Sequence, residues 1–254
     1  MTQEETVQTA VLGLGEAGAR YAADLAAAGW LVTGYDPAPV STPDGVTRAH
    51  SVADAVGAAN LVLSFTGERA AVPAAAEAGA AMSAGAAYAD FNTSAPAVKR
   101  EVQEACGVAV ADVAVLAPVP REGVRTPLIA SGDGASRVSR ALDGVGAPVE
   151  LLAEPVGAAA GRKLLRSVFM KGLAAAVVEA DAAGEAAGCP QWIQEQMGGE
   201  IGPELVARLL EGTRAHAGRR TREMQSCRAY LDELGTPAPV VDASLQWLRR
   251  LDEK

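Results

Sequence analysis

The stretch that decides the fold runs from Val11 to Asp36 and reads VLGLGEAGARYAADLAAAGWLVTGYD. A short apolar run leads into a glycine turn with G-x-G-x-x-G spacing, formed by Gly13, Gly15 and Gly18. The first glycine permits a tight turn, the second lets the backbone approach a phosphate, and the third allows a helix to pack on the strand. This pattern predicts a strand–turn–helix unit that holds a dinucleotide pyrophosphate at the helix N-terminus.

The cofactor site predicted from this stretch consists of the turn and the acidic residue that ends the next apolar run. Its residues are Gly13, Leu14, Gly15, Glu16, Ala17, Gly18 and Asp36. A carboxylate at position 36 accepts hydrogen bonds from the adenosine ribose hydroxyls. No cation follows until Arg48, whereas a 2′-phosphate is usually bound by a cation close to this strand, so we expect NAD in preference to NADP. The alternative is that Asp36 simply starts a turn before Pro37.

Strand and helix signals alternate along the first part of the chain and then stop. The alternation to about residue 152 predicts an α/β Rossmann-type doubly wound sheet, largely parallel, with helices on both faces. From Gly157 onward only helical patterns recur, beginning with a long helix over about residues 158–187. We therefore expect a dinucleotide-binding domain over residues 1–155 and an all-α C-terminal domain over residues 156–254.

Polar residues follow two further predicted strands, over residues 61–66 and 86–91. The positions expected to face the cofactor there are Ser64, Phe65, Thr66, Asn92 and Thr93. The carboxyl ends of strands line the ligand crevice of an open α/β sheet. We therefore expect Asn92, Thr93 and Ser94, which follow the second of these strands, on the nicotinamide side. The alternative is that Thr93 or Ser94 caps the helix that begins at Pro96.

Composition narrows the class of protein. The 254 residues carry a net charge of −9, which argues against a nucleic-acid partner. Three widely spaced cysteines without C-x-x-C spacing predict reduced thiols, with neither disulfides nor a metal site. The first six residues lack signal-peptide features, and the longest apolar stretch is too short to cross a membrane. We expect a cytoplasmic protein that acts on a small molecule.

The long helix carries Lys163 and Lys171, two of only four lysines in the chain. At 100° per residue they lie about 80° apart around the helix and share one side over two turns. A lysine in a partly dry cleft can exchange a proton with a carbonyl oxygen at neutral pH, which hydride transfer between a nicotinamide and an alcohol requires. The alternative is a pair of exposed lysines on a surface helix.

The order of these motifs resembles the β-hydroxyacid dehydrogenases, relatives of 3-hydroxyisobutyrate and 6-phosphogluconate dehydrogenases. The similar stretches are residues 13–18, 90–96, 112–123 and 157–163, and the nearest branch has a compact phosphogluconate dehydrogenase-like helical C-terminal domain. In this family a lysine on the long interdomain helix is the catalytic acid/base, and Lys163 matches its position. The resemblance also implies a homodimer formed through the helical domain.

The substrate site is expected from the same resemblance. Its candidate residues are Ser94, Pro118, Val119, Pro120, Ser167, Lys171 and His216. His216 has a structural alternative, because it precedes Gly218, where an imidazolium would favour the negative end of a helix. The functional alternative is that His216, Arg219 and Arg220 help form the substrate pocket, either of their own subunit or of a partner subunit.

Two departures from the family pattern concern the substrate. The usual Ser-Gly-Gly run is replaced by Val119-Pro120-Arg121, and the asparagine expected one turn after Lys163 is replaced by Arg166, beside Ser167. Arg121 or Arg125 would then bind an anion, or both would be solvated loop charges. The reaction class can carry over from the family while the substrate does not.

The sequence thus predicts an NAD(P)-dependent enzyme acting on CH–OH groups, which transfers a hydride between a nicotinamide and a small β-hydroxy acid or its keto form. One alternative is an imine or enamine reductase on the same scaffold, although such family members usually lack the catalytic lysine. The other is a non-catalytic nucleotide-binding protein. A short-chain dehydrogenase is excluded because no tyrosine is followed by lysine four residues later. A P-loop NTPase is excluded because the sequence contains no G-x-x-x-x-G-K-[ST] motif.

Overall fold

The structure is a computed structural model that describes residues 7–253. It divides into two compact units, one ending at Lys163 and the other starting at Leu164. The expectation that the chain starts without a signal peptide falls on residues 1–6, outside the described residues. Within the described part, no helix combines the length and apolar character needed to cross a membrane.

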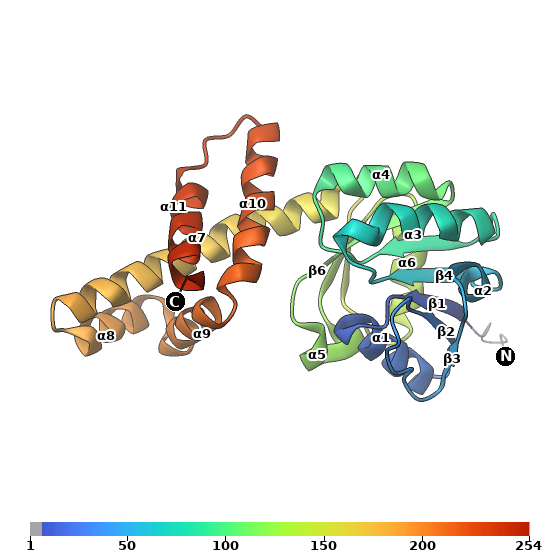
Figure 1. Ribbon diagram of the computed structural model, residues 1–254, viewed down its shortest axis with the longest axis horizontal. Helices are drawn as coiled ribbons and strands as arrows, with labels where there is room; N and C mark the ends of the chain where they lie inside the picture. The colour runs from blue at the N-terminus through green and yellow to red at the C-terminus, as the bar shows by residue number, and fades with distance from the viewer. Residues whose placement is uncertain (1–6, 254) are drawn as a thin grey trace. The chain divides into compact units, whose positions relative to one another are not determined.

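The described part of the first unit contains an eight-stranded sheet in the order β3-β2-β1-β4-β5-β6-β7-β8 (Figure 1). The strands are β1 (Gln8–Leu12), β2 (Leu31–Tyr35), β3 (Val46–Arg48), β4 (Leu61–Ser64), β5 (Ala87–Asp90), β6 (Ala109–Val115), β7 (Leu128–Ser131) and β8 (Val149–Leu151). Neighbouring strands pair in parallel, except that β6 and β7 are antiparallel. The strand order reverses between β1 and β4, where open α/β sheets form their ligand crevice. The predicted Rossmann-type sheet is confirmed.

Helices cover both faces of this sheet (Figure 1). They are α1 (Glu16–Ala27), α2 (Val52–Val56), α3 (Glu68–Ala81), α4 (Pro96–Cys106), α5 (Val119–Glu122), the 3-10 turn η1 (Gly123–Arg125) and α6 (Ala135–Asp143). Successive strand residues belong to opposite cores: Val11 packs in the cluster that contains α1 and α6, whereas Leu12 packs in the cluster that contains α2, α3 and α4. This alternation follows from the two-residue repeat of a strand buried on both faces.

The second unit is helical, as predicted. Its helices are most of α7 (Ala158–Ala186), α8 (Pro190–Ile201), α9 (Pro203–Ala215), α10 (Ala217–Glu233) and α11 (Pro239–Asp252). One apolar core joins α7 to α10 and α11, and another joins α7 to α9. The expectation that His216 ends a helix before Gly218 is wrong in one respect, because Gly218 lies inside α10 and His216 is the junction between α9 and α10.

Candidate active site

The glycine turn after β1 has the geometry of an anion cradle. Gly13 has a φ of +88°, and a Cβ on it would lie 2.6 Å from the carbonyl oxygen of Phe65. A Cβ on Gly18 would lie 1.9 Å from the carbonyl oxygen of Gly13, so both positions exclude any side chain. At Gly15, by contrast, a Cβ would meet no described atom within 4 Å. The turn therefore leaves open space beside the backbone of its middle glycine.

This open space lies at the start of α1, whose first turn contains Glu16 and Ala17. The N-cap is Gly15, and no described side chain caps the helix. The first backbone N–H groups of a helix have no partner within it, and they carry the positive end of the helix dipole. The residues present therefore fit a pyrophosphate, as the spacing of the glycines predicts.

Asp36, directly after β2, ties this turn to the neighbouring strand. Its Oδ2 accepts from the backbone N–H of Leu14 at 2.7 Å, and its Oδ1 accepts from the backbone N–H of Ala38 at 2.8 Å. The hydrogen bond from Ala38 forms a turn, which was the alternative role considered for Asp36. Each carboxylate oxygen can accept a further hydrogen bond, so the turn and the ribose contact are compatible.

The side chain of Arg48, the last residue of β3, reaches the loop after β2. Its Nη2 donates to the carbonyl oxygens of Asp36 at 2.6 Å and Ala38 at 3.1 Å, and its Nη1 donates to that of Val40 at 3.2 Å. The pairing of β2 with β3 brings this side chain to the end of β2. A cation is therefore present near Asp36, and its donors are directed at backbone carbonyls.

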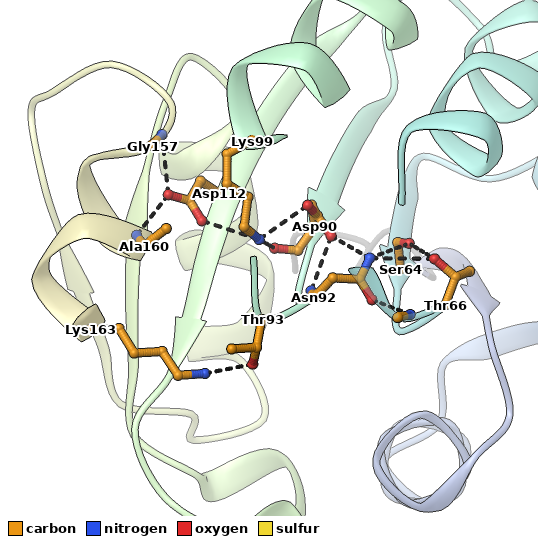
Figure 2. A network of polar contacts seen from close by, with 11 residues as sticks. Ser64, Thr66, Asp90, Asn92, Thr93, Lys99, Asp112, Gly157, Ala160 and Lys163 are labelled. Carbon is orange, nitrogen blue, oxygen red and sulfur yellow. Dashed lines mark hydrogen bonds and ion pairs between the residues drawn. The ribbon is translucent and has the colours of Figure 1, made fainter. Parts of the chain in front are cut away.

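Polar side chains that end or follow β4 and β5 form a connected group with Asp112, in the middle of β6, and Lys99 of α4 (Figure 2). We call this group the strand-end network. Its members are Ser64, Thr66, Asp90, Asn92, Lys99 and Asp112. Asn92 Nδ2 donates to Asp90 Oδ1 at 2.6 Å, and Asn92 Oδ1 accepts from the backbone N–H of Gly67 at 2.6 Å. The same amide nitrogen is 3.3 Å from Ser64 Oγ. Of the polar positions predicted after β4 and β5, the network brings together Ser64, Thr66 and Asn92.

Phe65 contributes packing at this edge of the sheet. Its ring stacks on Phe91, with a centroid separation of 4.6 Å, and lies 5.0 Å from the ring of Tyr21 on α1. The carbonyl oxygen of Phe65 is also the atom that excludes a side chain at Gly13. The loop after β4 therefore packs directly against the glycine turn.

Lys163 reaches the segment that follows β5. Its Nζ donates to Thr93 Oγ1 at 2.9 Å (Figure 2). The alternative role for Thr93 and Ser94, capping α4, is wrong, because the N-cap is Ala95 and Pro96 occupies the first turn. Ser94 Oγ is buried, with no hydrogen-bond partner among the described residues. A hydroxyl and an ammonium group thus meet where the nicotinamide side of the crevice was expected.

The loop after β6 differs from its expected form. Residues 119–122 form the short helix α5, which the sequence reading missed, with Pro118 as its N-cap. The Val119 side chain is buried in the core that contains α1, whereas Pro120 is exposed. Arg121 and Arg125 are exposed, as the solvated alternative describes. Of the three substrate candidates here, one is a core residue.

In the second unit, two of the substrate candidates lie together. Lys171 Nζ donates to Ser167 Oγ at 3.1 Å and forms an ion pair with Glu223 Oε2 at 2.7 Å. Glu223 comes from α10, the helix that begins directly after His216. His216 itself is exposed at the junction of α9 and α10.

The sequence reading passed over Lys99, although the lysine is only 1% exposed. Its Nζ lies 3.0 Å from Asp90 Oδ2 and 3.3 Å from Asp112 Oδ1, and it donates to the Asp90 carbonyl oxygen at 2.8 Å. A signal existed. Lys99 interrupts the apolar stripe of α4, where Val102 and Cys106 are buried at helical spacing. A lysine in such a stripe requires buried acidic partners.

Comparison with known protein families supports a dinucleotide-binding site in the first unit. Residues 8–119 match the NAD binding domain of 6-phosphogluconate dehydrogenase, and residues 185–251 match a domain of unknown function, DUF1932. A comparison with curated proteins gave no match.

Solved structures share the fold over nearly the whole chain. A conserved hypothetical protein from Sinorhizobium meliloti 1021 is 27% identical, with a TM-score of 0.81 over 97% of this chain and 89% of its own. The conserved protein MTH1747, described as structurally similar to 3-hydroxyacid dehydrogenases, is 25% identical, with a TM-score of 0.82 over 96% of both chains. Mycobacterium tuberculosis 3-hydroxyisobutyrate dehydrogenase, at 20% identity, has a TM-score of 0.83 over 98% of this chain and 94% of its own.

These matches confirm the resemblance to 3-hydroxyisobutyrate and 6-phosphogluconate dehydrogenase-like proteins. They also confirm the predicted class, an oxidoreductase with a nicotinamide cofactor.

Proposed function

We propose that this dehydrogenase-like protein transfers a hydride between NAD(H) and a small β-hydroxy acid or its keto form, with Lys163 as the general acid/base. The observation that carries the proposal is the hydrogen bond from Lys163 Nζ to Thr93 Oγ1 at 2.9 Å. Thr93 follows β5, and β5 lies on the far side of β4 from β1 and its glycine turn. The proton donor and the dinucleotide cradle therefore share the carboxyl edge of one sheet.

The residues proposed to hold the cofactor follow that edge. The N–H groups at the start of α1 bind the pyrophosphate, with Gly13, Gly15 and Gly18 leaving room for it. Asp36 accepts from the adenosine ribose, and the loops after β4 and β5 flank the nicotinamide through Ser64–Thr66, Asn92 and Thr93. The bound nicotinamide would supply or accept the hydride at the substrate carbon.

Lys163 acts on the oxygen of that same carbon. In the reductive direction its ammonium group gives a proton to the carbonyl oxygen as the alkoxide charge develops, and in the oxidative direction the neutral amine takes the hydroxyl proton. Thr93 orients the amine by accepting one of its hydrogen bonds. A fixed donor is worth more than a mobile one, because its geometry is set before the reaction begins.

We propose NAD in preference to NADP on two grounds. The Asp36 carboxylate at the end of β2 would repel a 2′-phosphate. The nearby Arg48 directs its donors at three backbone carbonyls, which supports a role in fixing the loop. We expect NADH to bind about tenfold or more tightly than NADPH, a difference of about 1.4 kcal/mol, and calorimetric titration of both cofactors tests this preference.

The substrate contacts would come from Ser94, Pro118, Val119, Pro120, Ser167, Lys171 and His216. We propose a substrate and dimerisation domain over residues 156–254, after a cofactor domain over residues 1–155. Large apolar side chains exposed on the second unit, Phe169 at 68% and Trp192 at 59%, support a homodimer through that region. Sedimentation velocity tests it.

A panel of hydroxy acids with NAD, and of keto acids and imines with NADH, tests the reaction class through nicotinamide absorbance. The proposal expects turnover with a hydroxy or keto acid, and a loss of about hundredfold or more in Lys163→Met. Turnover confined to imines would replace it with the imine reductase assignment. NADH binding without turnover on any member would favour a non-catalytic nucleotide-binding protein.

A further inference from the structure

The buried charge cluster around Lys99 has no part in the proton transfer described above. It holds one ammonium and two carboxylates, with side chains at most 2% exposed. Isolated buried charges cost several kcal/mol each, so such a cluster persists only where its geometry is well satisfied. Lys99 Nζ donates a hydrogen bond to the Asp90 carbonyl oxygen at 2.8 Å and forms ion pairs with Asp90 Oδ2 at 3.0 Å and Asp112 Oδ1 at 3.3 Å. Neither of these two carboxylate oxygens accepts a hydrogen bond from a described residue, so the charge of Lys99 is what compensates them.

The sheet register sets the positions of the two carboxylates. Ser64, Asp90 and Asp112 are direct partners across β4, β5 and β6, so they form one polar row. Ser131 continues the row on β7, opposite Asp112. All four side chains are fully buried. Lys99 enters this row from α4 and binds its two acidic members.

One branch from Lys99 leads to the helix that carries Lys163. Asp112 Oδ2 accepts from the backbone N–H groups of Gly157 at 3.1 Å and Ala160 at 2.9 Å (Figure 2). These groups belong to the start of α7, where a carboxylate is also stabilised by the helix dipole. Lys163 follows three residues after Ala160, so Asp112 fixes the turn from which Lys163 projects.

The other branch leads to the hydrogen-bond partner of Lys163. Asp90 Oδ1 accepts from the backbone N–H of Asn92 at 3.0 Å and from its side-chain amide at 2.6 Å. The next residue is Thr93, which accepts from Lys163 Nζ. The two branches therefore form a closed ring that returns to Lys99, and the hydrogen bond between Lys163 and Thr93 is its far side (Figure 2).

We propose that Lys99 is a positioning residue, which holds Lys163 and Thr93 in reacting geometry by binding the carboxylates that anchor both. A lysine suits this place because its compact ammonium can contact both carboxylates and the Asp90 carbonyl oxygen at once. Without that cation the two facing carboxylates repel each other, and the start of α7 and the segment after β5 lose their common anchor. The kinetic consequence rests on the proposed function, whereas the structural one does not.

The first test uses three variants. Lys99→Met removes the cation, and Lys99→Met/Asp112→Asn also removes one carboxylate, so it keeps the net charge of the cluster and an oxygen that can cap α7. Arg140→Met, at an exposed position, is the control for loss of one positive charge. Thermal unfolding shows which variants fold. If Lys99→Met does not fold, the double variant is used in its place.

The proposal expects kcat to fall about tenfold or more in a folded Lys99 variant, because a small misplacement of a reacting group is costly. KM and the Kd for NADH should stay within about threefold, because the glycine turn and Asp36, which are proposed to hold the pyrophosphate and the ribose, are untouched. Arg140→Met should behave as the wild type. A folded Lys99 variant with wild-type kcat, or one in which only NADH binding is lost, would overturn the proposal.

A spectroscopic readout separates this inference from the proposed function. The chain has only four lysines, so isotope-labelled lysine gives a spectrum that is simple to assign, with Lys163→Arg identifying the Lys163 signal. We expect the Lys163 signal to shift or broaden in the Lys99 variants and to stay in place in Arg140→Met. An unchanged signal contradicts the proposal even if the enzyme is active. A changed signal in a protein that turns over no substrate supports it while the proposed function fails.

Discussion

The glycine turn after β1 and the strand-end network belong to the same sheet, but different interactions stabilise them. Close backbone packing stabilises the turn, and pairing of buried charges stabilises the network. At the turn, Gly13 and Gly18 are required because neighbouring backbone oxygens occupy the space of a side chain. In the network, Lys99, Asp90 and Asp112 are required because each buried charge depends on the others. The turn should therefore be disrupted by an added side chain, and the network by loss of one charged group. Pyrophosphate binding at the turn and proton transfer by Lys163 should therefore respond to different substitutions.

The largest effect is expected when a methyl group is added to the turn. In Gly18→Ala the new Cβ would lie 1.9 Å from the carbonyl oxygen of Gly13, which no rotamer can relieve. We expect a loss of about 3 kcal/mol in the free energy of unfolding, together with loss of NADH binding. Urea denaturation measures the first and calorimetric titration the second.

Gly15→Ala is the matched control for stability alone, since its φ is −68° and its new Cβ would meet no described atom. Its stability should stay within about 0.5 kcal/mol of the wild type. Equal destabilisation of the two variants would mean that the turn is held by something other than close packing.

A smaller effect is expected at the junction of the turn with β2. Asp36→Ala removes the acceptor of the Leu14 and Ala38 N–H groups and the proposed partner of the ribose. We expect NADH affinity to fall about tenfold while kcat at saturating cofactor changes little. Asp44→Ala, at an exposed position, is the control. A fall in kcat without a change in NADH affinity would contradict the proposed role of Asp36 in cofactor binding.

The smallest effect is expected at Thr93, whose contact with Lys163 is exposed to solvent. Thr93→Val keeps the shape of the side chain and removes its hydroxyl. We expect kcat to fall about fivefold, corresponding to about 1 kcal/mol for one solvent-exposed hydrogen bond, with NADH affinity unchanged. Thr47→Val, exposed on β3, serves as the control in steady-state kinetics. No change in kcat would remove Thr93 from the site.

What the sequence predicted well was local. The G-x-G-x-x-G turn needs only the residues from Val11 to Gly18. The position of Lys163 was expected because a family resemblance supplied it. Its bond to Thr93 joins residues 70 positions apart and could not be read from spacing.

What the sequence did not predict depends on register and pairing between strands. Asp90 and Asp112 become neighbours only because β5 and β6 pair with those two residues opposite each other. Arg48 reaches the loop after β2 only because β3 pairs with β2. The α5 helix escaped notice because four residues that include Pro120 carry too weak a helical pattern.

The most direct test measures the Kd for NADH and the single-turnover rate of hydride transfer in two variants, Gly15→Ala and Lys163→Arg. Arginine keeps the positive charge and a donor for Thr93 but cannot give up its proton. We predict a Kd raised about tenfold in Gly15→Ala with its saturated rate preserved, and a rate lowered about hundredfold in Lys163→Arg with its Kd preserved. Hydride transfer at the wild-type rate in Lys163→Arg, or an unchanged Kd in Gly15→Ala, would contradict the account.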